Sequence, residues 1–155
     1  MAQKNLFIYP LKLPCYLLSI RKNPANAILE GVKPHEFRRR FKEYEGQIRV
    51  FLYVVAPDRE VIGEVVFDEP IKGNPEQLYG LLEGDIYNKK DRLEKYIGDC
   101  KTAYALPVVS FRRFKKPASV EDIRNVFNDF NPPQSYLNLE KPKYSELKNF
   151  LEQLV

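Results

Sequence analysis

The first elements of the chain are decided by residues 16–38, which read YLLSIRKNPANAILEGVKPHEFR. The apolar run over 16–20 predicts a short buried strand. In the segment that follows, Asn23 can cap a helix, Pro24 suits its first position, and Gly31 can end it in the left-handed conformation. This order predicts a strand followed by a helix of about two turns.

Residues 35–40 are expected to form the next strand. Side chains alternate between the two faces of a strand, so Glu36, Arg38 and Arg40 share one face and His35 points to the other. Glu36 and Arg38 are therefore expected to be neighbours on one surface.

The middle of the chain combines a hairpin with a helical insert. Residues 47–55 are rich in Val, Phe, Tyr and Ile and predict a central strand, which the turn over 56–59 joins to a second strand at 61–67. Residues 75–98 are charged and helix-compatible, and Gly98 is expected to end this insert.

The last third of the chain predicts one more strand and two helices. The strand spans 103–111, and Pro117 is expected to break it. Ser119 and Asp122 have capping-box spacing and start a helix to about Phe127. A closing helix at about 143–154 carries one apolar stripe, which predicts core packing rather than a partner groove. The stripe consists of Tyr144, Leu147, Phe150, Leu151 and Leu154.

Length and composition favour one domain over 1–155, since 155 residues with 44% hydrophobic content suffice for one core. Strands of uneven length with short helices between them favour an α+β fold with a mixed barrel over a doubly wound parallel sheet. No apolar run is long enough to span a membrane, and Pro10, Lys12 and Pro14 interrupt any signal peptide. A cytoplasmic protein is therefore expected.

Several kinds of site are excluded by residue types. Cys15 and Cys100 lack the spacing of a zinc site, which predicts two free thiols. His35 is the single histidine, and neither HExxH nor a glycine-rich phosphate loop occurs. A histidine-based triad, a metal centre and a nucleotide-binding P-loop are not expected, and no cofactor or metal is predicted.

Positive charge is concentrated in two runs. Residues 33–42 carry a formal +4 and residues 112–116 another +4, so the rest of the chain sums to −4. A basic locus on a mildly acidic body can attract a phosphate backbone to one place. The alternative is that both runs are solvated faces.

Together these stretches resemble the ASCH family of the PUA-like superfold, and in particular small stand-alone bacterial or phage-type members. The family hallmark GxKxxExR matches residues 31–38, after a strand and a helix. The resemblance runs from about Tyr16 to Tyr136. Further similar stretches are Ile62-Gly63-Glu64, Lys101 to Leu106, Lys116-Pro117 and Pro132 to Tyr136.

The resemblance implies a five- or six-stranded pseudo-barrel with a cleft beside the first helix, lined by the motif, and a role in RNA binding or RNA-linked chemistry. Lys33 suits a phosphate as a point charge, and Arg38 can contact it in bidentate fashion or be held by Glu36. Alternatively, Glu36 and Arg38 brace the barrel mouth and Lys33 is solvated. The candidate nucleic-acid-binding residues are Ser19, Arg21, Lys33, Glu36, Arg38, Arg40, Tyr104, Arg112, Arg113 and Tyr136.

Three functions follow as hypotheses. The first is a module that binds single-stranded or structured RNA, or a modified nucleotide, with Tyr104 or Tyr136 stacking on a base unless these rings belong to the core. The second is a hydrolase on RNA or modified nucleosides, with Lys33 stabilising negative charge and Glu36 as acid or base. The third is a protein-interaction module using 75–98 and the closing helix.

One activity of the family is not expected. ASCH relatives that cleave acetylated cytidine carry a nucleophilic threonine three residues after the motif lysine, and this chain has Glu36 there. A carboxylate is a poor substitute for the hydroxyl that accepts an acyl group.

Overall fold

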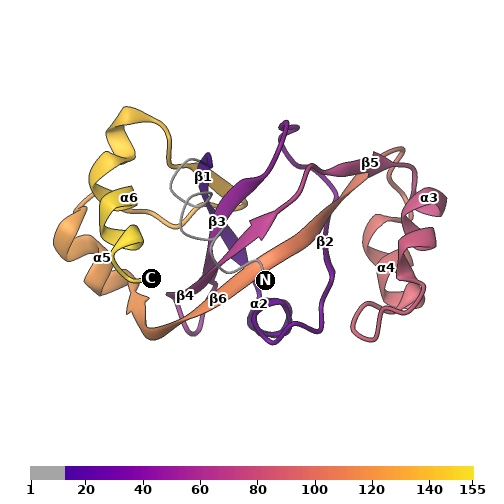
Figure 1. The fold of residues 1–155 in the computed structure, drawn as a ribbon, viewed down its shortest axis with the longest axis horizontal. Helices are drawn as coiled ribbons and strands as arrows, with labels where there is room; N and C mark the ends of the chain where they lie inside the picture. The colour runs from indigo at the N-terminus through magenta and orange to yellow at the C-terminus, as the bar shows by residue number, and fades with distance from the viewer. Residues whose placement is uncertain (1–12) are drawn as a thin grey trace, which may run out of the picture.

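A curled mixed sheet organises the protein, whose computed structural model describes residues 13–155 (Figure 1). Pro10 and Lys12, which weighed against a signal peptide, lie outside the described residues. The strands are β1 Cys15–Ile20, β2 His35–Arg38, β3 Ile48–Val54, β4 Glu60–Phe67, β5 Ile71–Gly73, β6 Ala103–Ser119 and β7 Tyr136–Asn138. The helices are α2 Lys22–Leu29, α3 Pro75–Tyr79, α4 Lys90–Ile97, α5 Val120–Val126 and α6 Ser145–Glu152, with short 3₁₀ turns at Gly80–Leu82 and Pro142–Tyr144.

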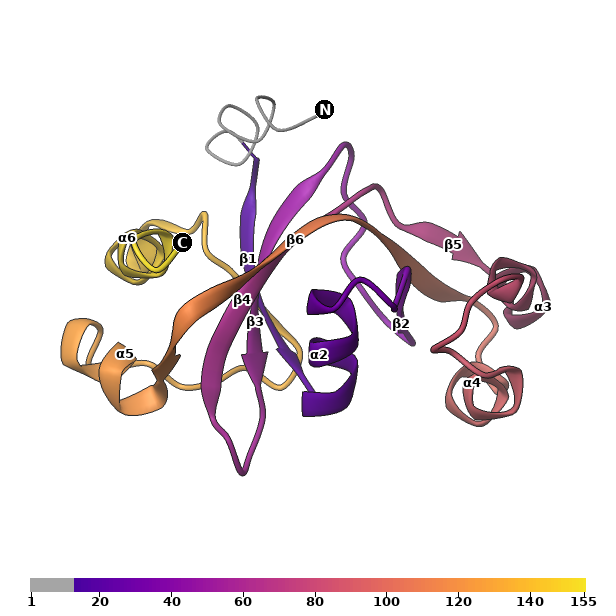
Figure 2. The same ribbon diagram turned by 60° about the horizontal axis from the view of Figure 1, so that its bottom comes forward.

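The strand order is β2-β6-β4-β3-β1-β7, and β5 also pairs with β6. β1 and β3 are parallel, and the other pairs are antiparallel. The 17-residue strand β6 pairs with β2 and β5 at one end and with β4 along the rest, and it curves across the whole molecule (Figure 2). The predicted α+β fold with a mixed pseudo-barrel is confirmed.

The sheet has seven strands in the described residues, where the resemblance implied five or six. The difference lies in β5 and β7, which are three residues long. Strands this short have too few residues to show a recognisable alternation of apolar and polar side chains. They form because a neighbouring strand offers free backbone N–H and C=O groups.

The first helix begins differently from the prediction. Its N-cap is Arg21, in an extended conformation and without a side-chain cap, so the prediction that Asn23 caps the helix is wrong. Pro24 falls within the first turn, where backbone N–H groups have no intrahelical partner and a proline costs little. Gly31 ends the turn after the helix at φ 77°, as predicted.

Two further expectations about strands need correction. The strand predicted over 35–40 ends at Arg38. Pro117 does not break β6, because the partners on β4 jump from Gly63 opposite Arg113 to Val61 opposite Ala118. The proline lies in the irregular stretch between these pairs, where a missing N–H is tolerated.

In residues 13–155, three apolar clusters pack against the two faces of the sheet and between the sheet and the insert. β3 is buried on both faces and contributes to the cluster around α2 and to the cluster under α5 and α6. The predicted packing of the closing helix is confirmed, since Leu147 and Leu151 are fully buried. The capping box is also confirmed, because Ser119 and Asp122 exchange both hydrogen bonds. Residues 75–98 form α3 and α4 at the end of the sheet opposite α5 and α6 (Figure 2).

No helix within residues 13–155 has both the length and the apolar character needed to cross a membrane.

Candidate functional site

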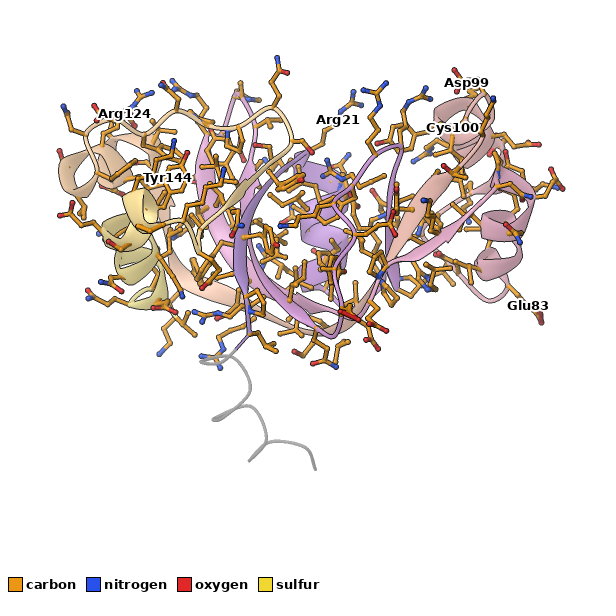
Figure 3. All side chains as sticks on the ribbon, turned by 90° about the horizontal axis from the view of Figure 1, so that it is seen from above. Arg21, Glu83, Asp99, Cys100, Arg124 and Tyr144 are labelled. Carbon is orange, nitrogen blue, oxygen red and sulfur yellow. The ribbon has the colours of Figure 1, made fainter. Side chains whose placement is uncertain are left out.

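A cleft of about 860 Å³ opens between the start of α2, the end of β1, strand β2 and the helical insert. Its walls therefore come from segments far apart in sequence, from Ser19 on β1 to Gln134 in the loop before β7. Arg21 stands on the edge of the molecule that also carries Asp99 and Cys100 (Figure 3). Most of the lining is provided by Ser19 to Pro24, Lys33, Glu36 to Arg38, Tyr87 to Lys89, Arg92, Leu93 and Tyr96.

Glu36 is the centre of the motif within this cleft. Arg38 Nε donates to Glu36 Oε2 at 2.9 Å, and Lys33 Nζ lies 3.6 Å from Glu36 Oε1. The side chains of Lys33, Glu36 and Arg38 are only 5%, 8% and 14% exposed. Three charges removed from water in this way need one another, since an unpaired buried charge is strongly destabilising.

Lys33 has a second partner that comes from the insert. Its ammonium donates to Asn88 Oδ1 at 2.8 Å and lies 4.8 Å from the ring centre of Tyr87. Asn88 is held in turn, because its amide donates to Asp85 Oδ2 at 2.8 Å and to the His35 carbonyl at 3.3 Å. Burial lowers the pKa of Lys33, while the negative charges of Glu36 and Asp85 oppose that effect.

Arg38 connects the motif to β1. Its Nη2 donates to the Ser19 carbonyl at 2.9 Å, and Ser19 Oγ donates to the Pro133 carbonyl at 2.6 Å. Ser19 is therefore a cleft residue whose hydroxyl proton is already engaged by the loop before β7.

His35 lies beside the cleft but does not line it. Its Nδ1 is buried and has no hydrogen-bond partner within residues 13–155. Burial lowers the pKa of His35, so the ring favours its neutral form.

The mouth of the cleft is strongly cationic. Among residues 13–155, six of the lining residues are lysine or arginine, and Glu36 is the single acidic one. Arg21, Lys89 and Arg92 are exposed and form no ion pair within the described part of the chain, whereas Lys22 lies 3.5 Å from Asp58. Such a surround favours an anionic ligand.

Some predicted site residues lie elsewhere. Arg40 and Tyr104 line a second, smaller hollow, because β2 ends before Arg40. Arg112 and Arg113 are exposed on β6, and Arg113 Nη1 donates to Asn26 of α2 at 3.1 Å. None of these four side chains lines the cleft.

Tyr136 is also outside the cleft and packs with the core. Its ring centre lies 4.9 Å from that of Phe41 and 5.9 Å from that of Tyr16. Tyr136 therefore packs against the core, as the alternative to base stacking expected.

Sequence reasoning missed the wall formed by the insert. The side chains of Tyr87, Asn88, Lys89, Arg92 and Tyr96 face the motif across the cleft. Asn88 and Lys33 are 55 positions apart. No spacing within the motif signals a partner at that distance.

No group of His, Cys, Asp and Glu side chains suited to hold a metal ion occurs within residues 13–155. Cys15 and Cys100 are both free thiols.

Comparison with known proteins places the fold. No family model matches the chain. A curated ASCH domain-containing ribonuclease from Zymomonas mobilis is 23% identical over 138 residues, which cover 89% of this chain and 93% of that protein. The crystal structure of ASCH from Zymomonas mobilis superposes with a TM-score of 0.76 at 23% identity, covering 88% of this chain and 94% of the other. The N-terminal domain of Staphylothermus marinus McrB has a TM-score of 0.55 at 10% identity, covering 90% of this chain and 96% of the other. The resemblance to the ASCH family that residues 18–38 indicated is thus confirmed, both in sequence along most of the chain and in fold.

Proposed function

We propose that this protein binds RNA through the cleft at the GxKxxExR motif, with a backbone phosphate against Lys33 and Arg38. The observation that carries the proposal is the lining, which has six cations and a single carboxylate. Asn88 and Glu36 engage the Lys33 ammonium, which has three donors in total, so it retains capacity for a phosphate oxygen. The name of the Zymomonas mobilis relative, a ribonuclease, supports RNA as the ligand class.

The size of the cleft favours one unpaired nucleotide over a duplex. A volume of about 860 Å³ lies within the range of roughly 300–1,000 Å³ typical of small-ligand sites. Tyr87 and Tyr96 line it, and Tyr96 is 42% exposed, so they replace Tyr104 and Tyr136 as candidates for stacking on a base.

The Glu36–Arg38 ion pair fits this role. The pair is closed, as the bracing alternative requires, yet it leaves the cleft open. A closed pair holds the Arg38 guanidinium in place before the ligand arrives, which lowers the ordering cost of binding. The protein-interaction alternative stays a prediction, since nothing in residues 13–155 identifies a protein partner.

Binding is tested with a fluorescein-labelled single-stranded RNA at about 50 and about 200 mM salt. The double variant Lys33→Ala, Arg38→Ala is expected to lose affinity, with the salt slope falling by about 0.7 for each phosphate contact removed. Lys115→Ala, Lys116→Ala is the matched control, because both lysines are exposed on β6 outside the cleft. Equal affinity of wild type and the Lys33, Arg38 variant at low salt contradicts the proposal.

A second variant separates binding from folding. Removing Lys33 and Arg38 leaves Glu36 buried with fewer partners, which destabilises the fold. Arg21→Ala, Arg92→Ala removes two exposed cations of the same cleft that have no ion pair in the described residues. This variant is expected to unfold at the wild-type temperature and to bind RNA more weakly.

RNA cleavage is the second candidate function, because Lys33 and Glu36 form an ion pair inside the cleft. In that reaction Lys33 stabilises developing negative charge and Glu36 transfers the proton. A product gel from the binding samples tests it, with Glu36→Gln expected to abolish cleavage while RNA binding persists. Intact RNA across pH and divalent metals leaves binding as the function.

Deacetylation of acetylated cytidine is expected to be absent or trace, and robust deacetylation would overturn that exclusion.

A further inference from the structure

A second hollow of about 330 Å³ lies beyond the end of β2. It is lined by Arg39, Arg40, Phe41, Cys100, Lys101, Thr102 and Tyr104. Two residues predicted to bind nucleic acid, Arg40 and Tyr104, meet here although the cleft does not include them.

The hollow carries free positive charge. Arg40 and Lys101 are exposed and take part in no ion pair within residues 13–155. The acidic groups nearby are already paired: Asp99 Oδ1 accepts from Arg39 Nη1 at 2.7 Å, and Glu43 accepts from Lys72 at 3.1 Å. Within the part of the chain that the structure describes, two cations therefore face this hollow without an anion paired to them.

The hollow adjoins the cleft through one segment. Arg38 lines the cleft, and Arg39 and Arg40 line the hollow. Arg39 also donates to the carbonyl of Tyr96, whose side chain lines the cleft. Because Arg38 and Arg40 are two residues apart, their Cα atoms are at most about 7 Å apart. One short oligonucleotide can therefore reach both places.

Resting on the proposed function, we infer that the hollow is a second phosphate subsite for the same RNA strand. Arg40 and Lys101 bind the backbone phosphate of a nucleotide next to the one held in the cleft. The Thr102 hydroxyl and the Tyr104 ring lie where the sugar or base of that nucleotide passes. A single nucleotide fills only the cleft, whereas an oligonucleotide occupies both.

The first test compares two ligands on one variant. Arg40→Gln, Lys101→Gln is expected to bind a labelled oligouridylate of twelve nucleotides roughly tenfold more weakly at low salt, with the salt slope reduced by about 1.4 for two lost contacts. Its affinity for uridine monophosphate is expected to be unchanged. Lys115→Gln, Lys116→Gln removes the same charge near the far end of β6 and is expected to change the slope little.

The second test uses a thiol already present in the hollow. Cys100 is half-buried and lines the hollow, whereas Cys15 is fully buried and its pKa is raised by burial to about 12. Alkylation by iodoacetamide therefore reports on Cys100. Saturating twelve-nucleotide RNA is expected to slow this alkylation severalfold, and saturating uridine monophosphate is expected to leave the rate unchanged.

The outcomes distinguish the subsite from the cleft. If the wild type does not bind RNA, both proposals fail. If it binds RNA, but Arg40→Gln, Lys101→Gln changes neither affinity nor slope and Cys100 stays unprotected, only the subsite is overturned. An equal loss of slope in the Lys115, Lys116 variant overturns the subsite too, because net charge then explains the effect.

Discussion

Lys33 shows how burial changes a residue that the sequence presents as an ordinary surface lysine. Its side chain is 5% exposed, and its ammonium pairs with Glu36 and donates to Asn88 Oδ1. An ammonium without a hydration shell interacts more strongly with a phosphate than an exposed one does, because little water is left to screen it. The position of Lys33 supports the prediction that it lines the cleft. Its burial does not fit the alternative in which Lys33 is solvated.

The lowered pKa of Lys33 leads to a pH prediction. As pH rises, the folded protein loses the Lys33 proton before an exposed lysine with the usual value of 10.5 would. RNA affinity is therefore expected to fall in alkaline solution below pH 10.5, and the Lys33→Arg variant, which stays charged, is expected to lack this loss. Anisotropy titrations across the alkaline range measure it, and identical pH profiles for both proteins would contradict it.

The lowered pKa of Lys33 affects stability in the opposite direction to RNA affinity. Between the folded and unfolded pKa values of Lys33 the unfolded chain binds more protons, so this residue's contribution to the free energy of unfolding rises with pH. Weaker RNA binding at alkaline pH is therefore not a consequence of unfolding at Lys33.

At the scale of elements, both ends of α2 contribute to the site, while Ile28 and Leu29 pack into the core. Arg21 at the N-terminal end faces the cleft, and Gly31 turns the chain so that the motif enters β2. A Cβ atom at Gly31 would lie 3.1 Å from Phe111 Cζ on β6. Glycine is thus favoured here by its positive φ, and the nearby Phe111 ring leaves little room for a Cβ atom.

Two glycine variants separate these requirements. Gly31→Ala and Gly46→Ala both place alanine at positive φ, at 77° and 69°, but nothing lies within 4 Å of a Cβ at Gly46. Each is expected to lose about 1 kcal/mol from backbone strain, and Gly31→Ala more because Phe111 must move. Thermal unfolding measures the difference. Equal losses in the two variants would show that Phe111 moves aside without cost.

For the molecule as a whole, the two ends of the sheet have different roles. The insert lies at the opposite end from α5 and α6 (Figure 2). The insert completes the cleft, while α5 and α6 cover an apolar cluster. Arg49 links the sheet to α6, since it donates to Glu64 at 3.0 Å and to Glu152 at 3.1 Å. The closing helix therefore stabilises the fold without lining the cleft.

This division predicts a stability defect that spares the site. Leu151 is fully buried in the cluster under α6, so Leu151→Ala is expected to cost about 2–5 kcal/mol of unfolding free energy. Glu146→Ala, on the exposed side of the same helix, is expected to be nearly neutral. Denaturant unfolding measures both. At a temperature where Leu151→Ala remains folded, its RNA affinity is expected to equal that of the wild type, and a matching loss of affinity would contradict the division.

The sequence by itself determined the local elements and the motif. Short-range sequence patterns predicted strand β1, the helix that ends before Gly31, the hairpin of β3 and β4, and the capping box at Ser119. The proximity of Glu36 and Arg38 was predictable in the same way, because alternation along a strand places both side chains on one face.

Only the tertiary structure decided which distant segments complete the site. The pairing of Lys33 with Asn88, the continuation of β6 past Pro117 and the separation of Arg40 and Tyr104 from the cleft depend on how the sheet curls and where the insert folds back. Such contacts join residues tens of positions apart, and they are set by burial and free backbone groups in the assembled fold. The periodicity that predicts helices and strands extends over a few residues, so it contains no information about them.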